Sequence, residues 1–369
     1  MTTAKTDVFI AGGGPAGLAA AIAARKKGLE AIVADGAQYP IEKACGEGLM
    51  PGTVQALREL GVELRKEDGM EFRGIRFVDG ARKVHAEFPR GSGIGMRRRT
   101  LHKRMVQAAE KSGAMLLWNT PVTGIETGGV HAGGRFYEAR WIVGADGAQS
   151  RIARWSGLNR GGRRSFRFAR QQHFQVSPWS EHVEIHWGAR SQAYVTPVGA
   201  NEICVAILSG DADAKMETLL AEHAELAGRL RGEKISTTER GGVTGTHRLR
   251  RVVRGNVILI GDASGTVDAI TGEGLRLGFE HAVAAVDAMV SGDLHEYERR
   301  HRQIARRPGN MAAVLQVLNG RPRLRERVLS AFAAAPEVFA KLIAVHVGES
   351  SLANVVAASA GLGWRLLFA

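Results

Sequence analysis

The sequence is poor in cysteine and in aromatic residues, and each scarcity excludes a class of protein. Its two cysteines, Cys45 and Cys204, cannot form a disulfide scaffold or a zinc site built from cysteines alone. Phe, Trp and Tyr make up only 6% of the 369 residues, whereas proteins that bind single-stranded nucleic acid interleave aromatic and basic side chains. Nucleic-acid binding is therefore a remote alternative, and salt-sensitive affinity for DNA would reveal it.

Metal-ligand spacing and long apolar runs are also lacking. The 12 histidines show no ligand spacing with carboxylates or cysteines, so we expect no metal. The apolar stretch at 8–24 is broken by glycines and a proline, which argues against a membrane span. Residues 1–6 are polar, and we expect no signal peptide and a cytoplasmic location. The apolar segment 342–369 predicts a docked terminal helix, with peripheral membrane contact as the alternative.

Basic residues and glycines are abundant. The 50 Lys and Arg residues exceed the 37 Asp and Glu residues by 13. They gather in short clusters at 97–104, 160–170, 248–254, 299–307 and 321–327. These clusters form either a plain solvated surface or a means of attracting an anionic partner: a dinucleotide, a carrier-bound substrate or an acidic membrane. The 47 glycines are about 13% of the 369 residues, whereas the ordinary share is about 7%. This excess indicates many sites of positive φ or of close backbone approach.

A strand–turn–helix–strand pattern opens the chain. Its parts are an apolar strand at 8–11, the turn GGGPAG at 12–17, a helix at 18–27 and a second apolar strand at 29–34. This is the setting that a dinucleotide fingerprint requires. Gly12 permits the tight turn, Gly14 lets a pyrophosphate approach the backbone, and Gly17 lets helix and strand pack closely. The helix N-terminus would face the phosphates, and Asp35 would accept hydrogen bonds from ribose hydroxyls.

The rest of the chain alternates strands and helices. We expect a hairpin at 72–88 that turns at Asp79 and Gly80, helices at 101–111 and 214–231, strands at 114–118, 122–127, 141–143, 166–176, 183–187, 193–197, 203–208 and 257–260, and helices from 273 onward that break at Pro308, Pro322 and Pro336. Within 183–187, apolar side chains alternate with Glu184 and His186. This alternation predicts an antiparallel sheet with one apolar and one wet face.

Three motifs in one order carry a family resemblance. They are Gly12-x-Gly14-x-x-Gly17 with its acid, GADGAQS at 144–150 and GDASGTVDAITGEG at 261–274. Together they resemble the FAD-binding superfamily of p-hydroxybenzoate hydroxylase, which also contains geranylgeranyl reductases and flavin-dependent halogenases, and the likeness covers roughly 5–290. It implies an α/β fold: a Rossmann-like FAD-binding domain of the glutathione-reductase type with an inserted antiparallel-sheet substrate domain and a helical C-terminus. The implied bounds are 1–70, 95–165 and 242–300 for the FAD-binding domain, 71–94 and 166–241 for the substrate domain, and 301–369 for the helical region.

The resemblance also implies a set of FAD-binding residues. The first motif would hold the ADP part, the Asp-Gly motif would lie near the pyrophosphate, and the Gly-Asp motif would hold ribityl and pyrophosphate. The implied residues are Gly12, Gly14, Pro15, Ala16, Gly17, Asp35, Lys43, Cys45, Arg98, Val122, Asp146, Gly147, Gly261, Asp262, Gly272, Glu273, Gly274 and Leu275. From the residues themselves, Asp262 follows a buried strand and can accept from a ribityl hydroxyl or cap a helix. A helix N-terminus after Gly272 would stabilise negative charge on a reduced flavin.

The sequence departs from the superfamily pattern at three places. Ala153 stands where an arginine is usual, Ala269 replaces a proline in the loop beside the flavin, and Asp35 replaces a glutamate. All three departures leave FAD binding intact, and the second and third bear on the fine geometry of the site.

Two chemistries compete for the flavin. The first is a monooxygenase that hydroxylates an aromatic or polyketide-like apolar molecule with O2 and NAD(P)H through a flavin C4a-hydroperoxide. The alternative is a reductase of isoprenoid or enone double bonds, favoured by Gly265 in the third motif and by the segment KACGEG at 43–48, where Cys45 would be the residue near flavin and substrate. No second glycine fingerprint is convincing, so NAD(P)H would dock transiently or a partner protein would supply electrons. Halogenation is disfavoured because the Trp-x-Trp-x-Ile-Pro motif is absent. Four sheet residues are candidates for the cavity or are plain sheet residues: Gln172, His173, Trp187 and Tyr194.

Overall fold

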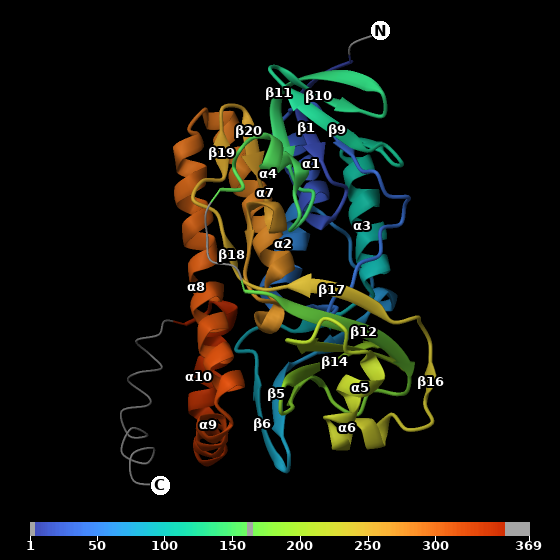
Figure 1. The fold of residues 1–369 in the computed structure, drawn as a ribbon, viewed down its shortest axis with the longest axis vertical. Helices are drawn as coiled ribbons and strands as arrows, with labels where there is room; N and C mark the ends of the chain where they lie inside the picture. The colour runs from blue at the N-terminus through green and yellow to red at the C-terminus, as the bar shows by residue number, and fades with distance from the viewer. Residues whose placement is uncertain (1–3, 161–164, 351–369) are drawn as a thin grey trace.

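Two large β-sheets lie one above the other along the long axis of the computed structural model, which describes residues 4–160 and 165–350 (Figure 1). We call them the upper and the lower sheet, after their places in Figure 1. Each draws its strands from distant parts of the sequence, so the chain crosses between the sheets several times. The division into domains stays a prediction.

The upper sheet has a parallel core. Its strand order is β19 (Val253–Arg254), β20 (Val257–Leu259), β11 (Arg135–Gly144), β1 (Ala4–Ala11), β2 (Ala31–Ala34) and β8 (Met115–Leu117), with the hairpin β9 (Val122–Glu126) and β10 (Gly129–Ala132) attached to β11. Only β19, β9 and β10 run antiparallel to their neighbours. Helices α1 (Pro15–Lys26), α3 (Arg98–Lys111) and α7 (Gly274–Ser291) pack together against it. Central strands β1 and β2 are continuously apolar where they are covered on both faces, as is usual for parallel sheets.

The lower sheet is mixed, which corrects the prediction of a purely antiparallel one. Its order is β16 (Lys234–Ile235), β12 (Arg167–Gln175), β15 (Glu202–Ser209), β14 (Ser191–Gly199), β13 (His182–Trp187), β5 (Gly74–Asp79) and β6 (Arg82–Glu87), and β17 (Arg240–Thr244) also pairs with β12. The predicted hairpin of β5 and β6 is present, and it turns at Gly80 and Ala81, one residue later than predicted. The hairpin ends at Glu87 and the next strand of this sheet begins at Arg167, about eighty residues later. Strand β5 lies parallel to β13. Alternation within a strand carries no information about the direction of its neighbour, so this pairing was not visible in the sequence.

The prediction of a solvent-exposed face on the lower sheet is wrong, because helices cover that face. Glu184 and His186 are both 4% exposed and lie on the face packed by α5 (Met216–Ala221) and α6 (Ala224–Arg229). Glu184 accepts hydrogen bonds from His186, Trp179 and Arg76. Burial alone would raise its pKa, but these hydrogen bonds outweigh burial and lower the pKa to about 2. The two helices also replace the single helix predicted at 214–231.

One long helix, α8 (Leu294–Gly320), joins the two sheets. It runs through Pro308, where a break was predicted, whereas α9 (Pro322–Ala334) and α10 (Pro336–Val347) begin at their prolines as expected. Tyr297 near the start of α8 donates to the Leu259 carbonyl of the upper sheet at 2.5 Å, and Met311 packs in the core of the lower sheet. Anchors on both sides of Pro308 therefore hold one continuous helix.

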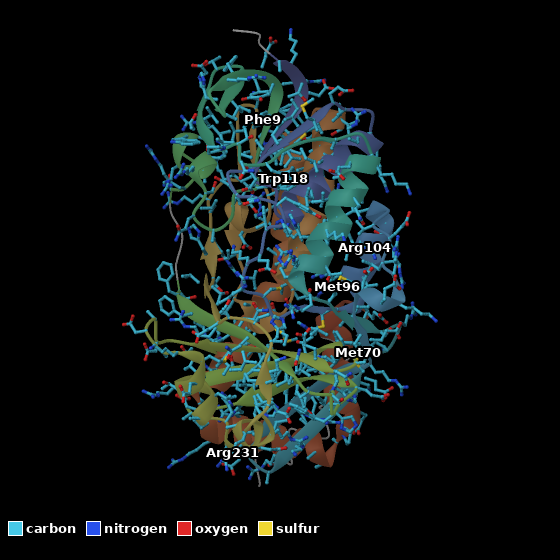
Figure 2. The ribbon with its side chains drawn as sticks, turned by 90° about the vertical axis from the view of Figure 1, so that its right-hand side faces the viewer. Phe9, Met70, Met96, Arg104, Trp118 and Arg231 are labelled. Carbon is cyan, nitrogen blue, oxygen red and sulfur yellow. The ribbon has the colours of Figure 1, made fainter. Side chains whose placement is uncertain are left out.

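Smaller elements complete the described chain. They are α2 (Pro51–Leu60), α4 (Arg151–Trp155), the small sheet of β3 (Gly48–Leu49), β7 (Gly93–Gly95) and β4 (Met70–Phe72), the pair β18 (His247–Arg248) and β21 (Gly265–Thr266), and three 3-10 segments at Lys66–Asp68, Gly261–Ser264 and Ala269–Thr271. Figure 2 shows Phe9 among the strands of the upper half and Met96 near the junction with the lower half, and both side chains are buried.

The C-terminal part was predicted to end in a docked helix at 342–369. Helix α10 packs on the lower sheet up to Val347, and the predicted part beyond 350 lies outside the described residues. No single helix within the described ranges is long and apolar enough to cross a membrane, and α9 with α10, bent by 109°, passes the same test only as a pair.

Candidate functional site

A cavity of about 710 Å³ lies where the two sheets meet. The upper sheet contributes the carboxyl ends of β1 and β2, the place where parallel α/β sheets bind ligands. The lower sheet contributes side chains of β5, β13, β14 and β15, and α8 and α10 close it from the side. The structure thus brings three separate glycine motifs to one cavity.

Nearly all of the predicted cofactor residues line this cavity. Those that do are Gly12, Gly14, Pro15, Ala16, Asp35, Lys43, Cys45, Arg98, Val122, Asp146, Gly147, Gly261, Asp262, Gly272, Gly274 and Leu275. We call this part of the cavity the cofactor end. Gly17 and Glu273 do not line it. The carboxylate of Glu273 is buried and paired with Arg276 instead.

The glycines of the first turn have different tasks. Gly12 has φ +114°, and a Cβ on Gly17 would lie 1.9 Å from the Gly12 carbonyl oxygen. These two glycines therefore allow α1 to approach β1. Gly14 differs, because a Cβ there would have no atom of the described residues within 4 Å. Its backbone faces open space in the cavity, which is what an approaching phosphate group needs.

Two helices begin at the cavity, and no side chain caps either of them in the described structure. Helix α1 has Gly14 as its N-cap, and α7 has Glu273, whose side chain makes no cap hydrogen bond. The first N–H groups of a helix lack intrahelical partners and carry partial positive charge. Both helix starts therefore offer binding positions for an anionic group.

The predicted acidic residues are not equally free to bind a ligand. Asp35 accepts from the N–H groups of Gly13 and Ala37 at 2.7 and 2.8 Å. Asp146 accepts from Ser150 and from two N–H groups at the start of α4, so it orders that turn. Asp262 is half exposed and has a long contact of 3.8 Å with Lys43. Of the three carboxylates, that of Asp262 is the most available for hydroxyl groups of a ligand.

Arg98 supplies an unsatisfied donor at the cofactor end. Its Nη1 atom is buried and has no hydrogen-bond partner among the described residues. Burial lowers the pKa of Arg98, while nearby Cys45, Asp262 and Glu47 act in the opposite direction. A buried guanidinium N–H without a partner is costly, so this atom fits a ligand that carries hydrogen-bond acceptors. The glycine cradle, the two helix starts and Arg98 together fit the anionic cofactor FAD.

The cavity continues from the cofactor end into an apolar part of the lower half. We call this part the apolar end, and its lining includes Ile75, Phe77, Val183, Ile185, Ile270, Met311, Leu315, Leu342 and Ile343. Tyr194 also lines the cavity and donates to the Ile270 carbonyl at 3.1 Å, and burial raises the pKa of Tyr194. An apolar enclosure of this kind binds apolar ligands and excludes water.

Of the four sheet candidates, only Tyr194 lines the cavity. Trp187 packs edge-on against Phe77 in the core, and Gln172 is directed to the Thr237 carbonyl at 3.4 Å. Its neighbour Gln171 lines the cavity instead, because successive side chains of a strand point to opposite faces.

The sequence analysis missed Glu47 as a site residue. Glu47 lines the cavity, is 3% exposed and has the left-handed backbone angle φ +59°, which is uncommon outside glycine. Cys45 lines the cavity beside it, and burial raises the pKa of its thiol although Arg98 opposes the shift. The only available signal for Glu47 was its place between two glycines in the segment 43–48.

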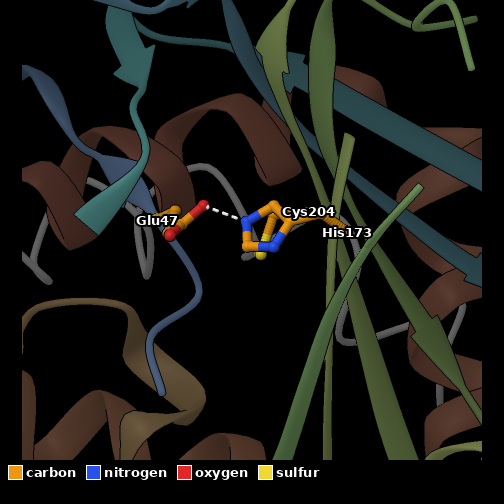
Figure 3. A group of neighbouring side chains, drawn as sticks. All are labelled: Glu47, His173 and Cys204. Atoms are coloured by element: carbon orange, nitrogen blue, oxygen red, sulfur yellow. Dashed lines mark hydrogen bonds and ion pairs between the residues drawn. The ribbon is translucent and has the colours of Figure 1, made fainter. Parts of the chain in front are cut away.

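Glu47, His173 and Cys204 form a buried group (Figure 3). Their ligand atoms all lie within 4.8 Å of one another, a separation that a metal ion could bridge. The spacing argument missed the group because pairing of β12 with β15 places His173 opposite Cys204. However, Glu47 Oε2 and His173 Nε2 are only 2.7 Å apart, while two ligands of a tetrahedral zinc lie about 3.3 Å apart. The distance is that of a hydrogen bond.

Comparisons with known proteins agree with this site. A family model described as FAD binding domain matches residues 5–292. Menaquinone reductase of Mycolicibacterium smegmatis is 28% identical, over 79% of this chain and 78% of its own. Digeranylgeranylglycerophospholipid reductase 1 of Methanothermobacter thermautotrophicus is 27% identical, over 81% of this chain and 83% of its own. A flavoprotein/dehydrogenase structure from Cytophaga hutchinsonii superposes with a TM-score of 0.82 at 18% identity, covering 93% of both chains, and shows the same fold.

Proposed function

Because the chain belongs to the FAD binding domain family and is an FAD-dependent oxidoreductase, we propose that it reduces a carbon–carbon double bond of an apolar, isoprenoid-like molecule. The carrying observation is the continuity of the cavity: its cofactor end opens directly into an apolar end. The similar proteins support reduction over the hydroxylation that the sequence ranked first, since both are named reductases.

The residues of the cofactor end would hold FAD through complementary groups. The starts of α1 and α7 and the free donor of Arg98 would bind anionic and acceptor groups, and Asp262 would accept from hydroxyls. FAD bound here supplies two-electron hydride transfer. The N-terminus of α7 would stabilise negative charge that develops near it.

The apolar end would position the double bond and exclude water. Leu315 and Ile343 come from α8 and α10, and Ile185 comes from the facing sheet. Side chains on two rigid elements can hold an apolar chain without polar anchors, because burial of its surface provides about 25 cal/mol per Å².

Cys45 is the thiol of this proposed reductase site. Its raised pKa keeps the thiol protonated at neutral pH, so it acts as a weak donor and a small apolar contact and not as a thiolate nucleophile. Exchange of Cys45 for Ala should impair reduction.

The electron donor would be NAD(P)H that docks transiently, or a partner protein. The glycines at 241–245 fall largely within β17 and those at 93–95 within β7. Neither has the strand–turn–helix setting of a second dinucleotide site. The arginine clusters of the sequence would attract either donor.

Anaerobic turnover separates reduction from hydroxylation. Purified protein with FAD, a chemical reductant and a prenylated lipid, kept free of oxygen, should yield a product with two additional hydrogens by mass spectrometry. A product that forms only with air and carries one additional oxygen atom would replace this proposal with the monooxygenase alternative.

A further inference from the structure

The buried pair of Glu47 and His173 touches the cavity on one side and the edge of the lower sheet on the other. We propose that Glu47, His173 and Thr237 form a proton relay that carries protons from solvent to the substrate in the cavity. The proposal rests on the proposed reduction, because saturating a double bond consumes one hydride and one proton.

Glu47 is the inner end of the relay. Its backbone lies between Gly46 and Gly48, and all three residues line the cavity. Its Oε1 accepts a hydrogen bond from the backbone N–H of Arg98 at 2.8 Å. This bond fixes the carboxyl group beside the cofactor end. Its left-handed backbone angle of φ +59° is unfavourable for a residue with a side chain, so the surrounding contacts hold it in place.

His173 is the middle of the relay and contacts both neighbours with its ring nitrogens. Nε2 lies 2.7 Å from Glu47 Oε2, and Nδ1 lies 2.9 Å from Thr237 Oγ1 (Figure 3 shows the first contact). The Thr237 hydroxyl oxygen also accepts from the backbone N–H of His173 at 3.1 Å. The hydroxyl proton of Thr237 is then available to be donated to His173 Nδ1. The ring proton of neutral His173 therefore lies on Nε2, which donates it to Glu47.

Thr237 is the outer end of the relay. It is half-buried and follows β16, the edge strand of the lower sheet, where Ile235 is 52% exposed. Solvent therefore reaches the Thr237 side of the chain, while Glu47 and His173 are buried. A hydrogen-bonded path with one wet end and one buried end has the arrangement that proton transfer into a closed site requires.

Other charged and titratable groups surround the pair without interrupting it. Arg98 faces Glu47, and Cys45 and Cys204 lie on the remaining sides. Glu202 faces His173 but is held by Arg97 at 2.7 Å and by Ser236 at 2.6 Å. Ser236 thus offers a hydroxyl next to Thr237 that is outside the relay.

The proton balance of the step closes. One carbon of the double bond receives a hydride, the two-electron reductant being the reduced flavin of the proposed function. The other carbon receives the proton of the Glu47 carboxyl group. Glu47 regains a proton from His173 Nε2, Nδ1 takes the hydroxyl proton of Thr237, and water restores Thr237. Two new C–H bonds replace one π bond. The step leaves the His173 proton on Nδ1, and proton exchange with water after product release restores the resting Nε2 tautomer before the next turnover.

Nitrogen NMR of the full-length protein without FAD tests the relay apart from any activity. With ¹⁵N-labelled histidine, His173 should carry its proton on Nε2 and accept at Nδ1. The T237V substitution should shift the Nδ1 resonance, whereas T237S and the neighbouring S236A should leave it unchanged. A proton on Nδ1 in the wild-type protein would overturn the relay, as would a stoichiometric metal ion found by elemental analysis and lost in E47Q.

Kinetics with FAD bound test whether the relay is used. E47Q should lower kcat about one hundred-fold, the lower end of the usual range for general acid catalysis. T237V, which removes only the outer hydroxyl, should lower kcat by a smaller factor, and KM should change little in either variant. The solvent deuterium isotope effect on kcat should rise in T237V and should return to the wild-type value in T237S. Equal kcat and isotope effect in T237V, S236A and wild type would overturn the relay. If wild-type protein reduces no alkene, the proposed function fails, and the NMR result still decides the hydrogen-bond chain.

Discussion

Gly14 and Gly17 lie three residues apart in the same turn, yet the structure assigns them opposite consequences. A side chain on Gly17 would meet the Gly12 backbone at 1.9 Å, while a side chain on Gly14 would enter open cavity. The first position concerns folding and the second concerns the ligand.

Alanine at each position should separate these roles. Gly17→Ala should lower the free energy of unfolding by about 2 kcal/mol or more, because backbone cannot move aside cheaply. Gly14→Ala should change it by less than about 1 kcal/mol and weaken FAD binding by about ten-fold or more, since its methyl group occupies the phosphate approach. Denaturant unfolding and fluorescence titration with FAD measure the two effects. Equal FAD affinity of Gly14→Ala and wild type would contradict the assignment.

Arg98 carries a second prediction at the residue scale. Arg98→Met should weaken FAD binding about ten-fold, as expected for loss of one hydrogen bond from a charged donor, and should not destabilise the protein without FAD, because Nη1 has no partner in the described structure. Arg99→Met, at the exposed neighbouring position, is the matched control and should bind FAD normally. Calorimetric titration measures the affinities. Similar losses in both variants would indicate a general charge effect instead.

At this scale most of the predicted glycines and Arg98 line one cavity, their contact with FAD stays a prediction, and the sequence analysis missed Glu47. Spacing identifies residues whose backbone conformation is constrained, as at Gly12. It does not show which distant side chains contact each other. The hydrogen bond between Glu47 and His173 depends on the packing of a loop against β12. Gln171 and Gln172 make the same point, since the register of a strand decides which of them faces the cavity.

Among the elements, α8 shows that tertiary contacts can override a local helix-breaking residue. Proline inside a helix removes one hydrogen bond and costs about 3 kcal/mol, which favoured a break at Pro308. Tyr297 in the upper core and Leu315 in the lower core hold the helix on both sides. Pro322 and Pro336 ended helices as predicted because each starts a new helix.

Helices α7 and α8 meet through two stacked histidines, His281 and His301, whose ring centroids are 4.1 Å apart. Burial lowers the pKa of His281 well below its usual value, and burial followed by nearby Arg302 lowers that of His301 to about 4. His301 also contacts Ser264 at 2.9 Å. Both imidazoles are therefore neutral in the folded protein at neutral pH.

Acid should weaken this contact between helices. The unfolded chain binds a proton at His301 below pH about 6.5, but the folded chain does so only below about 4. Stability is therefore present above pH 6.5 and falls as the pH is lowered to 4, by up to about 3 kcal/mol from His301. His301→Phe should reduce this loss, and His295→Gln, at an exposed position of the same helix, should not. Denaturant unfolding across this pH range measures it, and parallel curves for His301→Phe and wild type would contradict the prediction.

For the whole molecule, the sequence predicted the half that contains the upper sheet better than the half that contains the lower sheet. Parallel strands joined by glycine turns can be predicted from short stretches of sequence, and β1, α1 and β2 follow the prediction closely. The lower sheet depends on contacts between distant segments, such as β5 with β13 and α5 and α6 over Glu184. The alternation of apolar and polar residues in 183–187 predicted one solvent-exposed face. The sequence of a strand does not show which helices cover it.

The central proposal is that the cofactor end would hold FAD and the apolar end would hold an apolar double bond for reduction. The most direct measurement is rapid mixing, without oxygen, of the reduced flavoprotein with a prenylated lipid. The account predicts that the yellow absorbance of oxidised flavin returns with one equivalent of saturated product per flavin. Reduced flavin that stays colourless with such alkenes and is oxidised only when oxygen is admitted would contradict it.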